Sequence, residues 1–311
     1  MRLDLLGAGG VFSAADAAVH GLDGHALGRL VRSGECLRLT RGWYAVTPAE
    51  PLTARSRHAL TATALGRAHA GRAVVSHHGA LVLHGLPTYA VDLDIVHLTL
   101  LPRPSGARVP NASARRRGLV IHRPVPGLAA SPPPVTGGSS VTTTVPLAWA
   151  VVQTGLVHGP EAALVPADAA LARGLVTVER LARAVEGLAG HPGLSAVRAA
   201  LPHADGRHES PGETRTAYVL RSLGFDLEPQ VELTAEGRRY RADFRVRGTR
   251  VLVEFDGAVK YADPRALFEE KRREDALRRA GWVLVRVVWA DLADPGRLGS
   301  RLHRALEQAA A

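Results

Sequence analysis

The sequence has a single cysteine and almost no lysine. Cys36 alone cannot form an internal disulfide or a zinc site built from several cysteines, and so little cysteine is typical of the reducing cytoplasm. No uncharged apolar run approaches the roughly 18 residues of a membrane span, so we expect a cytoplasmic protein that no membrane segment anchors. Only two of the 39 basic residues are lysines, Lys260 and Lys271. Because Lys offers a compact ammonium that Arg cannot mimic, the stretch that holds both is a candidate for chemistry.

Acidic residues are fewer than basic ones in this chain. The 311 residues carry 39 Lys plus Arg against 29 Asp plus Glu, which gives a net charge of +10. Hydrophobic residues make up 46%, as in ordinary folded proteins, so an acidic disordered chain is excluded. The basic excess is largest between residues 58 and 130, whereas residues 207 to 311 are dense in both signs. Double-stranded DNA is therefore the expected partner.

Residues 10 to 47 predict two short helices followed by a β-hairpin. Ser13 is a suitable N-cap for the first helix, and GHALGRLVRSG has the apolar spacing of the second. This is a winged helix-turn-helix pattern, in which the second helix enters the major groove and the hairpin forms the wing. The arginines placed to contact DNA are Arg29, Arg32, Arg38 and Arg41. The alternative is a small helical domain whose arginines are simply solvated.

The middle region, residues 58 to 206, predicts an α+β arrangement that is poor in chemistry. Its histidines are a possible exception, and they include His77, His78, His84, His97 and His122. They lie without nearby carboxylates and without the HExxH spacing of a zinc enzyme. Structural histidines are therefore favoured over a metal site.

The first 200 residues resemble the AbiEi family of antitoxins from type IV toxin–antitoxin systems. The segments that carry the resemblance are GGVFSAADA, LVRSGECLRLTRGWYAV, SHHGALVLHGLP and VHLTL. The resemblance implies a promoter-binding repressor with an N-terminal winged helix. It also implies a nucleotidyltransferase-like toxin as a possible partner.

The last region, residues 207 to 311, begins with a helix signal. Ser210, Pro211 and Glu213 have the spacing of a capping box with proline at the first helical position. Glu213 is therefore explained equally well as a helix cap and as an active-site acid. It serves both roles only if its side chain turns away from the backbone.

Two strands joined by a turn at Gly248 then bring acidic residues together. The alternation of RRYRADFRVRG and TRVLVEFDG places Asp243 on one strand near Glu254 and Asp256 on the other. Carboxylates gathered in this way repel one another unless a cation is bound, and their oxygen atoms favour Mg²⁺ or Mn²⁺. Such an ion can activate water for attack on a phosphodiester.

The two lysines follow these acids. Lys260 is placed to orient a water molecule or to offset charge on the phosphate. Lys271 lies in the helical stretch FEEKRREDALRRAG, which either follows the DNA backbone or is a solvated, salt-bridged helix.

This order of residues resembles the PD-(D/E)XK nuclease superfamily, in the branch close to very-short-patch-repair endonucleases. The resemblance implies a mixed sheet flanked by helices, with Asp243 and Glu254 as metal ligands, Glu213 as an accessory acid and Lys260 as the catalytic lysine. Where many relatives carry Lys, two residues after the glutamate, this chain has Asp256.

The sequence therefore predicts an α/β protein, α+β overall, of three parts: a winged helix in residues 1–57, an AbiEi-like region in residues 58–206 and a nuclease-like domain in residues 207–311. The first functional hypothesis is a DNA-binding, metal-dependent endonuclease or nickase. The second is an AbiEi-like repressor and antitoxin whose nuclease-like domain does not cleave.

Overall fold

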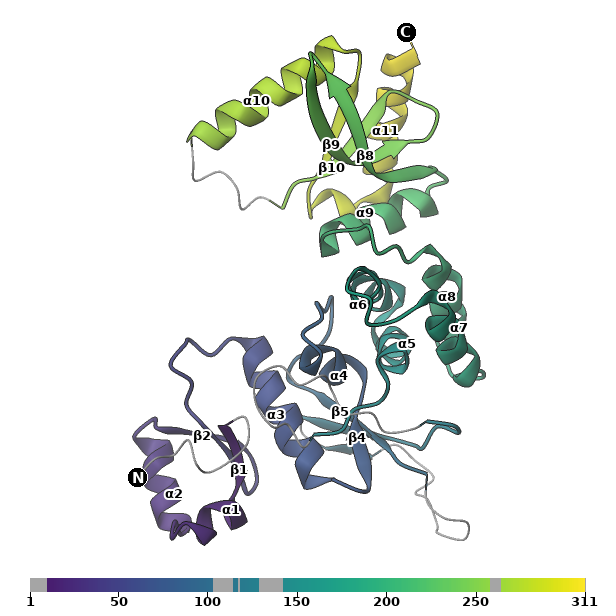
Figure 1. The fold of residues 1–311 in the computed structure, drawn as a ribbon. Helices are drawn as coiled ribbons and strands as arrows, with labels where there is room; N and C mark the ends of the chain where they lie inside the picture. The colour runs from purple at the N-terminus through teal and green to yellow at the C-terminus, as the bar shows by residue number, and fades with distance from the viewer. Residues whose placement is uncertain (1–9, 103–113, 117, 129–141, 258–263, 311) are drawn as a thin grey trace. The chain divides into compact units, whose positions relative to one another are not determined.

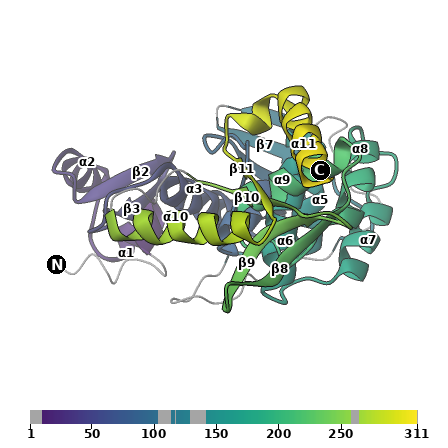
Figure 2. The ribbon, with the colours of Figure 1, turned by 90° about the horizontal axis from the view of Figure 1, so that it is seen from above.

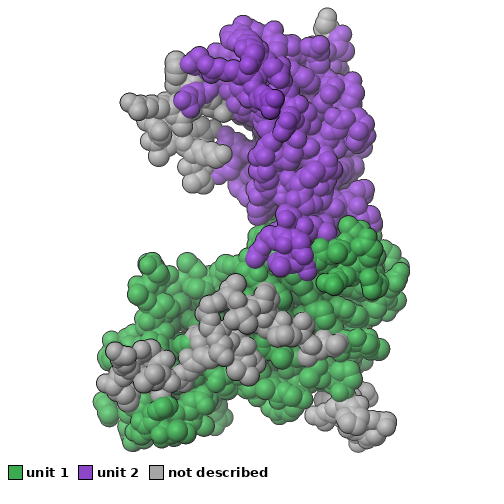
Figure 3. All heavy atoms as spheres, viewed as in Figure 1, with its two compact units in different colours: residues 1–166, 176–199 green, residues 167–175, 200–311 purple. Residues whose placement is uncertain are grey.

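The computed structural model describes residues 10–102, 114–116, 118–128, 142–257 and 264–310. The chain divides into two compact units (Figure 3). Unit 1 comprises Met1–Pro166 and Val176–Ala199, and unit 2 comprises Ala167–Leu175 and Ala200–Ala311. Within the described residues, no helix is long and apolar enough to cross a membrane.

Unit 1 begins with the two helices and the hairpin that the sequence predicts (Figure 1). The elements are β1 (Val11–Ser13), α1 (Ala14–Val19), α2 (Gly24–Arg32), β2 (Cys36–Thr40) and β3 (Trp43–Val46). Ser13 and Asp16 form a reciprocal capping box at α1, and Asp23 caps α2 through the backbone N–H of Ala26 at 2.7 Å. The strands form a sheet in the order β1-β3-β2, so the winged helix-turn-helix pattern is confirmed.

Both faces of this small sheet are covered. Phe12, Leu27 and Cys36 form a core beneath the helices, which leaves the single thiol buried. On the other face, helix α3 (Ala54–Ala68) packs Ala64 against the strands. The expected boundary after residue 57 therefore falls in the first turns of a helix that completes the packing of the sheet.

The middle of unit 1 is a four-stranded sheet with helices on it. Its strands are β4 (Ala73–Val75), β5 (Val96–Leu100), β6 (Ala114–Arg116) and β7 (Leu119–His122). They lie in the order β4-β5-β7-β6, and β5 and β7 are parallel. Helix α4 (His77–Leu83) directly follows β4, which agrees with the α+β arrangement expected for this region.

A group of helices follows, consisting of α5 (Leu147–His158), α6 (Pro160–Ala172), α7 (Val178–Gly187) and α8 (Leu194–Ala200). Helix α6 contains Pro166, after which the chain belongs to unit 2. In unit 2, the Asp168 carboxylate accepts hydrogen bonds from the Thr214 hydroxyl at 2.7 Å and from the backbone N–H of Asp205 at 2.8 Å. The end of α6 is thereby attached to the C-terminal fold.

Unit 2 is built on a second four-stranded sheet, in the order β11-β10-β9-β8. Its elements are α9 (Pro211–Ser222), β8 (Leu227–Ala235), β9 (Arg238–Val246), β10 (Val251–Phe255), α10 (Pro264–Arg279), β11 (Val283–Val287) and α11 (Pro295–Ala310), with short 3₁₀ turns at Leu201–His203 and Asp291–Ala293. The β8–β9–β10 strands are antiparallel, whereas β10 and β11 are parallel and are joined through α10. The expected mixed sheet is therefore present.

Helices cover both faces of this sheet. Leu220 of α9 and Leu302 of α11 share one core with Phe244 and Val253, whereas Leu277 of α10 packs on the other face (Figure 2). In β9, the buried Ala242, Phe244 and Val246 alternate with the half-buried Asp243 and Arg245, whereas β10 begins with three buried apolar residues and ends at the half-buried Glu254 and Phe255. The overall class, α+β, agrees with the class expected from the sequence.

Candidate functional site

Three carboxylates meet at one end of the unit 2 sheet. Glu213 lies in the first turn of α9, Asp243 in β9 and Glu254 in β10. The pairing of Leu252 with Arg245 and of Val253 with Phe244, continued by one residue, sets Asp243 across from Glu254. The hairpin thus has the geometry that its sequence predicts.

Asp243 is the carboxylate most affected by its surroundings. The pKa of Asp243 is raised to about 6, with burial as the largest cause and with the neighbouring charges of Glu213 and Glu254 acting in the same direction. The backbone N–H of Phe255, which donates to Asp243 Oδ2 at 2.8 Å, and the Arg273 guanidinium act in the opposite direction. The fold therefore disfavours the anionic form of Asp243 unless a cation compensates it.

Glu213 lies in the first turn of α9, and its carboxylate is close enough to Asp243 to affect the pKa of that residue. Its backbone N–H donates to Ser210 Oγ at 3.1 Å, so Ser210 caps α9. Glu213 Oε2 accepts hydrogen bonds from the backbone N–H of Glu209 and from Gln230 Nε2, both at 2.9 Å. The carboxylate thus bonds to the residue before Ser210, which is a change from the expected capping box. The side chain therefore does not turn away from the backbone, which was the condition for serving both roles, and the active-site role of Glu213 stays a prediction.

Gln230 is a member of this site that the sequence does not reveal. It lies in β8 between the paired residues Pro229 and Val231, and its φ is 53°. This left-handed value is uncommon for a residue other than glycine and costs conformational energy. The conformation accompanies the hydrogen bond that its side chain donates to Glu213. No pattern in the sequence signals this partner.

A close approach of helix α9 to strand β10 holds Glu213 in place. A Cβ atom added at Gly212 would overlap the ring of Phe255, so the backbone can approach this closely only at a glycine. The Phe255 ring in turn packs edge-on against Trp289, with ring centroids 4.9 Å apart, and the Arg215 guanidinium lies 5.7 Å from the Trp289 ring. This packing sets the position of Glu213 relative to β10.

Arg273 of α10 supplies a positive charge to the site. Its guanidinium donates to both carboxylate oxygens of Glu254, at 3.1 Å for Oε2, and also to the carbonyl of Arg241 at 3.2 Å. The side chains of this ion pair are 22% and 12% exposed for Arg273 and Glu254. Arg273 is not among the residues that the sequence predicts for the site, although it lies in the EKRRED run, which was the available signal.

A groove of about 890 Å³ opens beside these acids. Asp243, Glu254 and Asp256 line it together with a set of arginines: Arg238, Arg241, Arg272, Arg273, Arg279 and Arg286. Arg241 and Arg279 are 54% and 62% exposed, in contrast to the nearly buried Glu254. The half-buried acids therefore lie beside a groove whose exposed lining carries both arginines and the acids Glu236 and Glu269.

The remaining candidates from the sequence are placed as follows. Asp256 is half-buried and lines the groove, and its backbone N–H donates to Val287 at 2.8 Å. Lys271 is exposed on α10. Lys260 lies outside the described residues.

The arginines predicted to contact DNA are exposed in unit 1. Arg29 and Arg32 are on α2, Arg38 is on β2, and Arg41 is in the turn of the hairpin. Within the parts of the chain that the structure describes, none of the four is in an ion pair. By contrast, Trp43 and Tyr44 are partly buried against the core of the winged helix, as their apolar rings predict. The exposed surface of the helix and hairpin is therefore basic.

Comparison with known proteins finds a matching family, similar sequences and a similar solved structure. Residues 3–47 match the family described as transcriptional regulator, AbiEi antitoxin. Two proteins of Mycobacterium tuberculosis, the uncharacterized protein MT2308 of strain CDC 1551 / Oshkosh and the uncharacterized protein Rv2248 of strain ATCC 25618 / H37Rv, are each 29% identical over 276 residues, which cover 87% of this chain and 93% of theirs. A solved structure, the homing endonuclease I-Bth0305I catalytic domain, aligns with 32% of this chain and 97% of its own, with 15% identity and a TM-score of 0.27. Residues 3–47 are therefore similar to an AbiEi antitoxin-type transcriptional regulator.

Proposed function

We propose that this chain is a DNA-binding protein whose unit 2 hydrolyses phosphodiester bonds with a divalent metal ion, as an endonuclease or nickase. The observation that carries the proposal is the convergence of Glu213, Asp243 and Glu254, from three separate elements, beside a groove lined by arginines. We also propose that unit 2 is related to the very-short-patch-repair branch of the PD-(D/E)XK superfamily.

The donor set fits Mg²⁺ or Mn²⁺. All three side chains offer carboxylate oxygens, which hard divalent cations prefer, and Asp243 is held where its negative charge is poorly compensated. Asp243 and Glu254 would hold the ion, with Glu213 as an accessory acid. When bound, such an ion supplies an activated water and a Lewis acid for the phosphate.

The chain's own residues perform the other steps. Arg241 and Arg279 are exposed beside the groove and would bind the phosphates of DNA by exchanging their ion pairs with Glu209 and Glu236, so each adds less affinity than an unpaired arginine. Since the pKa of Asp243 is about 6, most of this carboxyl group is ionised above neutral pH and is available as a ligand. Lys260 is proposed to orient the attacking water or to offset charge on the phosphate.

The N-terminal domain is proposed to bind the DNA. Helix α2 presents Arg29 and Arg32, and the hairpin presents Arg38 and Arg41, in the arrangement in which a winged helix contacts the major groove and the flanking phosphates. Lys271, on α10, is proposed to add a phosphate contact in unit 2.

The test is cleavage of supercoiled plasmid by the purified full-length protein with Mg²⁺ or Mn²⁺. Asp243→Asn and Glu254→Gln keep the shape of each side chain but remove its charge, so cleavage falls by roughly 100-fold or more while DNA binding is retained. Lys260→Arg also loses cleavage if a compact amine is required. Glu307→Gln, at an exposed position on α11, is the matched control and cleaves like the wild type. Cleavage that persists in Asp243→Asn would rule out this site as its source.

A second candidate function is an AbiEi-like transcriptional repressor and antitoxin that does not cleave. It is favoured by the match over residues 3–47 and by the Arg273 ion pair, which already supplies a positive charge to Glu254. This candidate predicts binding to its own promoter, neutralisation of a nucleotidyltransferase-like toxin encoded nearby, and no nicking by the wild type with either metal. Nicking that depends on Asp243 would contradict it.

A further inference from the structure

Unit 1 gathers histidine side chains from five separate elements around His97. They are His58 of α3, His77 and His78 of α4, His97 of β5, His122 of β7 and His158 of α5. His58, His77, His78 and His97 are buried, whereas His122 and His158 are half-buried. So many imidazoles in one core require partners for their ring nitrogens, because an unpaired buried polar atom costs free energy.

Two overlapping triads have the spacing of metal ligands. His77, His97 and His122 form the first, and His78, His97 and His158 form the second. In each triad, one ring nitrogen from every residue lies within 4.8 Å of the others. His97 belongs to both.

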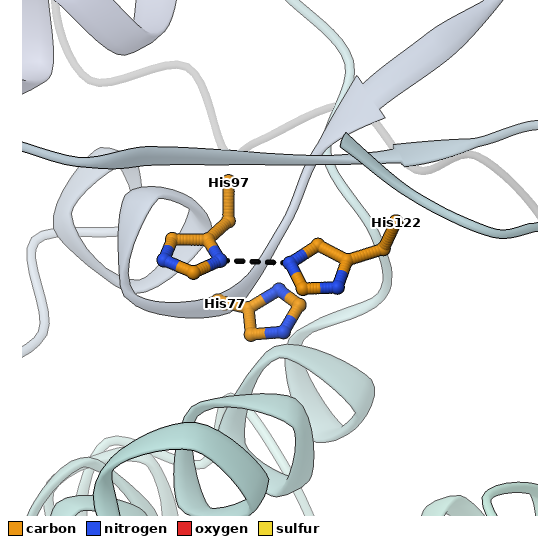
Figure 4. A group of neighbouring side chains, drawn as sticks. All are labelled: His77, His97 and His122. Atoms are coloured by element: carbon orange, nitrogen blue, oxygen red, sulfur yellow. Dashed lines mark hydrogen bonds between the residues drawn. The ribbon is translucent and has the colours of Figure 1, made fainter. Parts of the chain in front are cut away.

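The first triad is satisfied internally. His97 Nδ1 and His122 Nε2 share a hydrogen bond at 2.8 Å, and His77 Nδ1 bonds to Ser76 Oγ at 2.9 Å. Figure 4 shows the His77 ring beside this bonded pair, and its centroid lies 4.6 Å from that of His97 and 4.2 Å from that of His122. Stacked rings bonded to one another do not need a cation.

The second triad is different, because two of its residues, His78 and His158, each have a buried ring nitrogen without a hydrogen-bond partner among the described residues. The carbonyl of Ile95 can only accept, so His78 Nε2–H donates to it at 2.9 Å and the lone pair of His78 is on Nδ1. Among the described residues, neither His78 Nδ1 nor His158 Nε2 has a hydrogen-bond partner, and both atoms are buried. With Nδ1 of His97 bonded to His122, its Nε2 is the nitrogen left for a further partner.

We propose that His78, His97 and His158 bind one divalent transition-metal ion in unit 1, with Zn²⁺ as the occupant. Three neutral imidazoles are ligands that suit zinc and its neighbours, and the triad lacks the carboxylates that Mg²⁺ or Ca²⁺ requires. The bond from His78 to Ile95 is the kind of backbone contact that orients a metal-binding histidine.

The ion has a structural consequence for unit 1. His78 comes from α4, His97 from β5 and His158 from the end of α5, so a shared ligand sphere joins two helices to the central sheet. These segments are far apart in the sequence and therefore separate when the chain unfolds. Metal binding to the folded state alone stabilises unit 1, and the stabilisation grows with the logarithm of the ratio of free metal concentration to Kd.

The experiment titrates the full-length, chelator-treated protein with ZnCl₂ by calorimetry and with CoCl₂ by visible absorption. The wild type binds one zinc ion tightly and develops the strong d–d absorption of a four-coordinate cobalt site. His158→Gln changes a half-buried residue at a helix end and weakens zinc binding by roughly tenfold or more. His20→Gln, at an exposed histidine of α1's C-terminus in the same unit, is the control and binds zinc like the wild type.

His122→Gln separates the two triads. It retains tight zinc binding if the second triad is the site, and it loses binding if the first triad is the site, which would overturn the assignment. Circular dichroism of each variant establishes that it is folded before its affinity is compared. Wild-type protein that shows neither tight zinc binding nor the cobalt spectrum would also overturn the proposal, and buried water would then be the partner of these nitrogens.

Discussion

Burial shifts the pKa values of the histidine cluster of unit 1 and of the carboxylate cluster of unit 2 in opposite directions. Burial, the largest cause, lowers the pKa of His78 and of His122 to about 4 and that of His97 to about 2, whereas it raises the pKa of Asp243 to about 6. In both clusters the fold favours the neutral form. Neutral imidazoles present lone pairs to a soft or borderline cation, while crowded carboxylates need a hard one. The same physical cause therefore acts in both of the cation sites that we propose.

The two units also differ in how they use arginine. Those of unit 2 are largely engaged with acids, as in Arg247 with Asp226 and Glu228, and Arg279 with Glu236. The four predicted DNA-contacting arginines of unit 1 are exposed, and no ion pair engages them within the described ranges. Charge that is already paired adds little to binding a polyanion, so we expect unit 1 to contribute more to DNA affinity than its share of the arginines implies.

The largest expected effect is on the stability of the metal-free protein as a function of pH, because the two clusters change it in opposite directions. The histidine pKa values are lowered on folding, so below about pH 6.5 the unfolded chain binds protons that the folded chain does not. Each of His78, His97 and His122 then costs up to about 1.4 kcal/mol of stability per pH unit as pH falls toward 4. Calorimetric unfolding in the presence of a chelator measures this loss, and His122→Gln reduces it.

The contribution of Asp243 to stability changes with pH in the opposite direction. Its pKa is raised on folding, so its contribution is lost as pH rises from about 4 to about 6, by up to about 1.4 kcal/mol per pH unit. Other acids of unit 2 titrate in the same range, so the measurement is the difference in stability between wild type and Asp243→Asn at each pH. A difference that does not move in favour of the wild type on acidification would contradict the raised pKa.

A substitution at Gly212 tests whether the carboxylate site depends on packing that the histidine cluster does not share. Gly212→Ala places a methyl group against the Phe255 ring and costs about 1 to 3 kcal/mol of unit 2 stability, with reduced cleavage because Glu213 moves. Gly296→Ala, whose Cβ would lie 3.7 Å from the nearest side-chain atom, is the control within about 0.5 kcal/mol. Equal effects of the two variants, or zinc binding impaired by Gly212→Ala, would break the comparison.

The smallest expected effect concerns the arginines. Arg29→Gln and Arg32→Gln each lower the slope of log affinity against log salt by about 1, because each removes one phosphate contact. Arg247→Gln, an exposed arginine of unit 2 that is already paired, leaves the slope unchanged. Fluorescence anisotropy across a salt series measures all three. A larger change for Arg247→Gln than for Arg29→Gln would show that unit 2 supplies more of the DNA affinity.

Point variants suit this test better than removal of residues 1–57. Helix α3 begins at Ala54, and its residue Ala64 packs against the sheet of the winged helix. A chain cut at residue 57 loses the first turn of α3 and exposes the face that this helix covers. Reduced DNA affinity in such a fragment would therefore mix the loss of arginines with the loss of structure.

Much of the fold is predictable because its signals are local. Ser13 and Ser210 mark helix starts through hydrogen bonds within a few residues, and alternating side chains around Gly248 define a hairpin. The same hairpin brings Asp243 and Glu254 together, since residues across a tight turn must pair. Gln230 and Arg273 were not predictable in this way, because they reach the acids from β8 and from α10 through tertiary packing.

The sequence by itself determined the order of the elements, the winged helix and the pairing of Asp243 with Glu254, because caps, turns and side-chain alternation act between near neighbours. Only the tertiary structure decided which histidines meet. His78, His97 and His158 have no spacing that marks them as a group, and they converge because α4 and α5 pack together and α4 packs on β5. Long-range packing depends on whole surfaces rather than on short motifs, so a site assembled from three distant elements is invisible until the chain is folded.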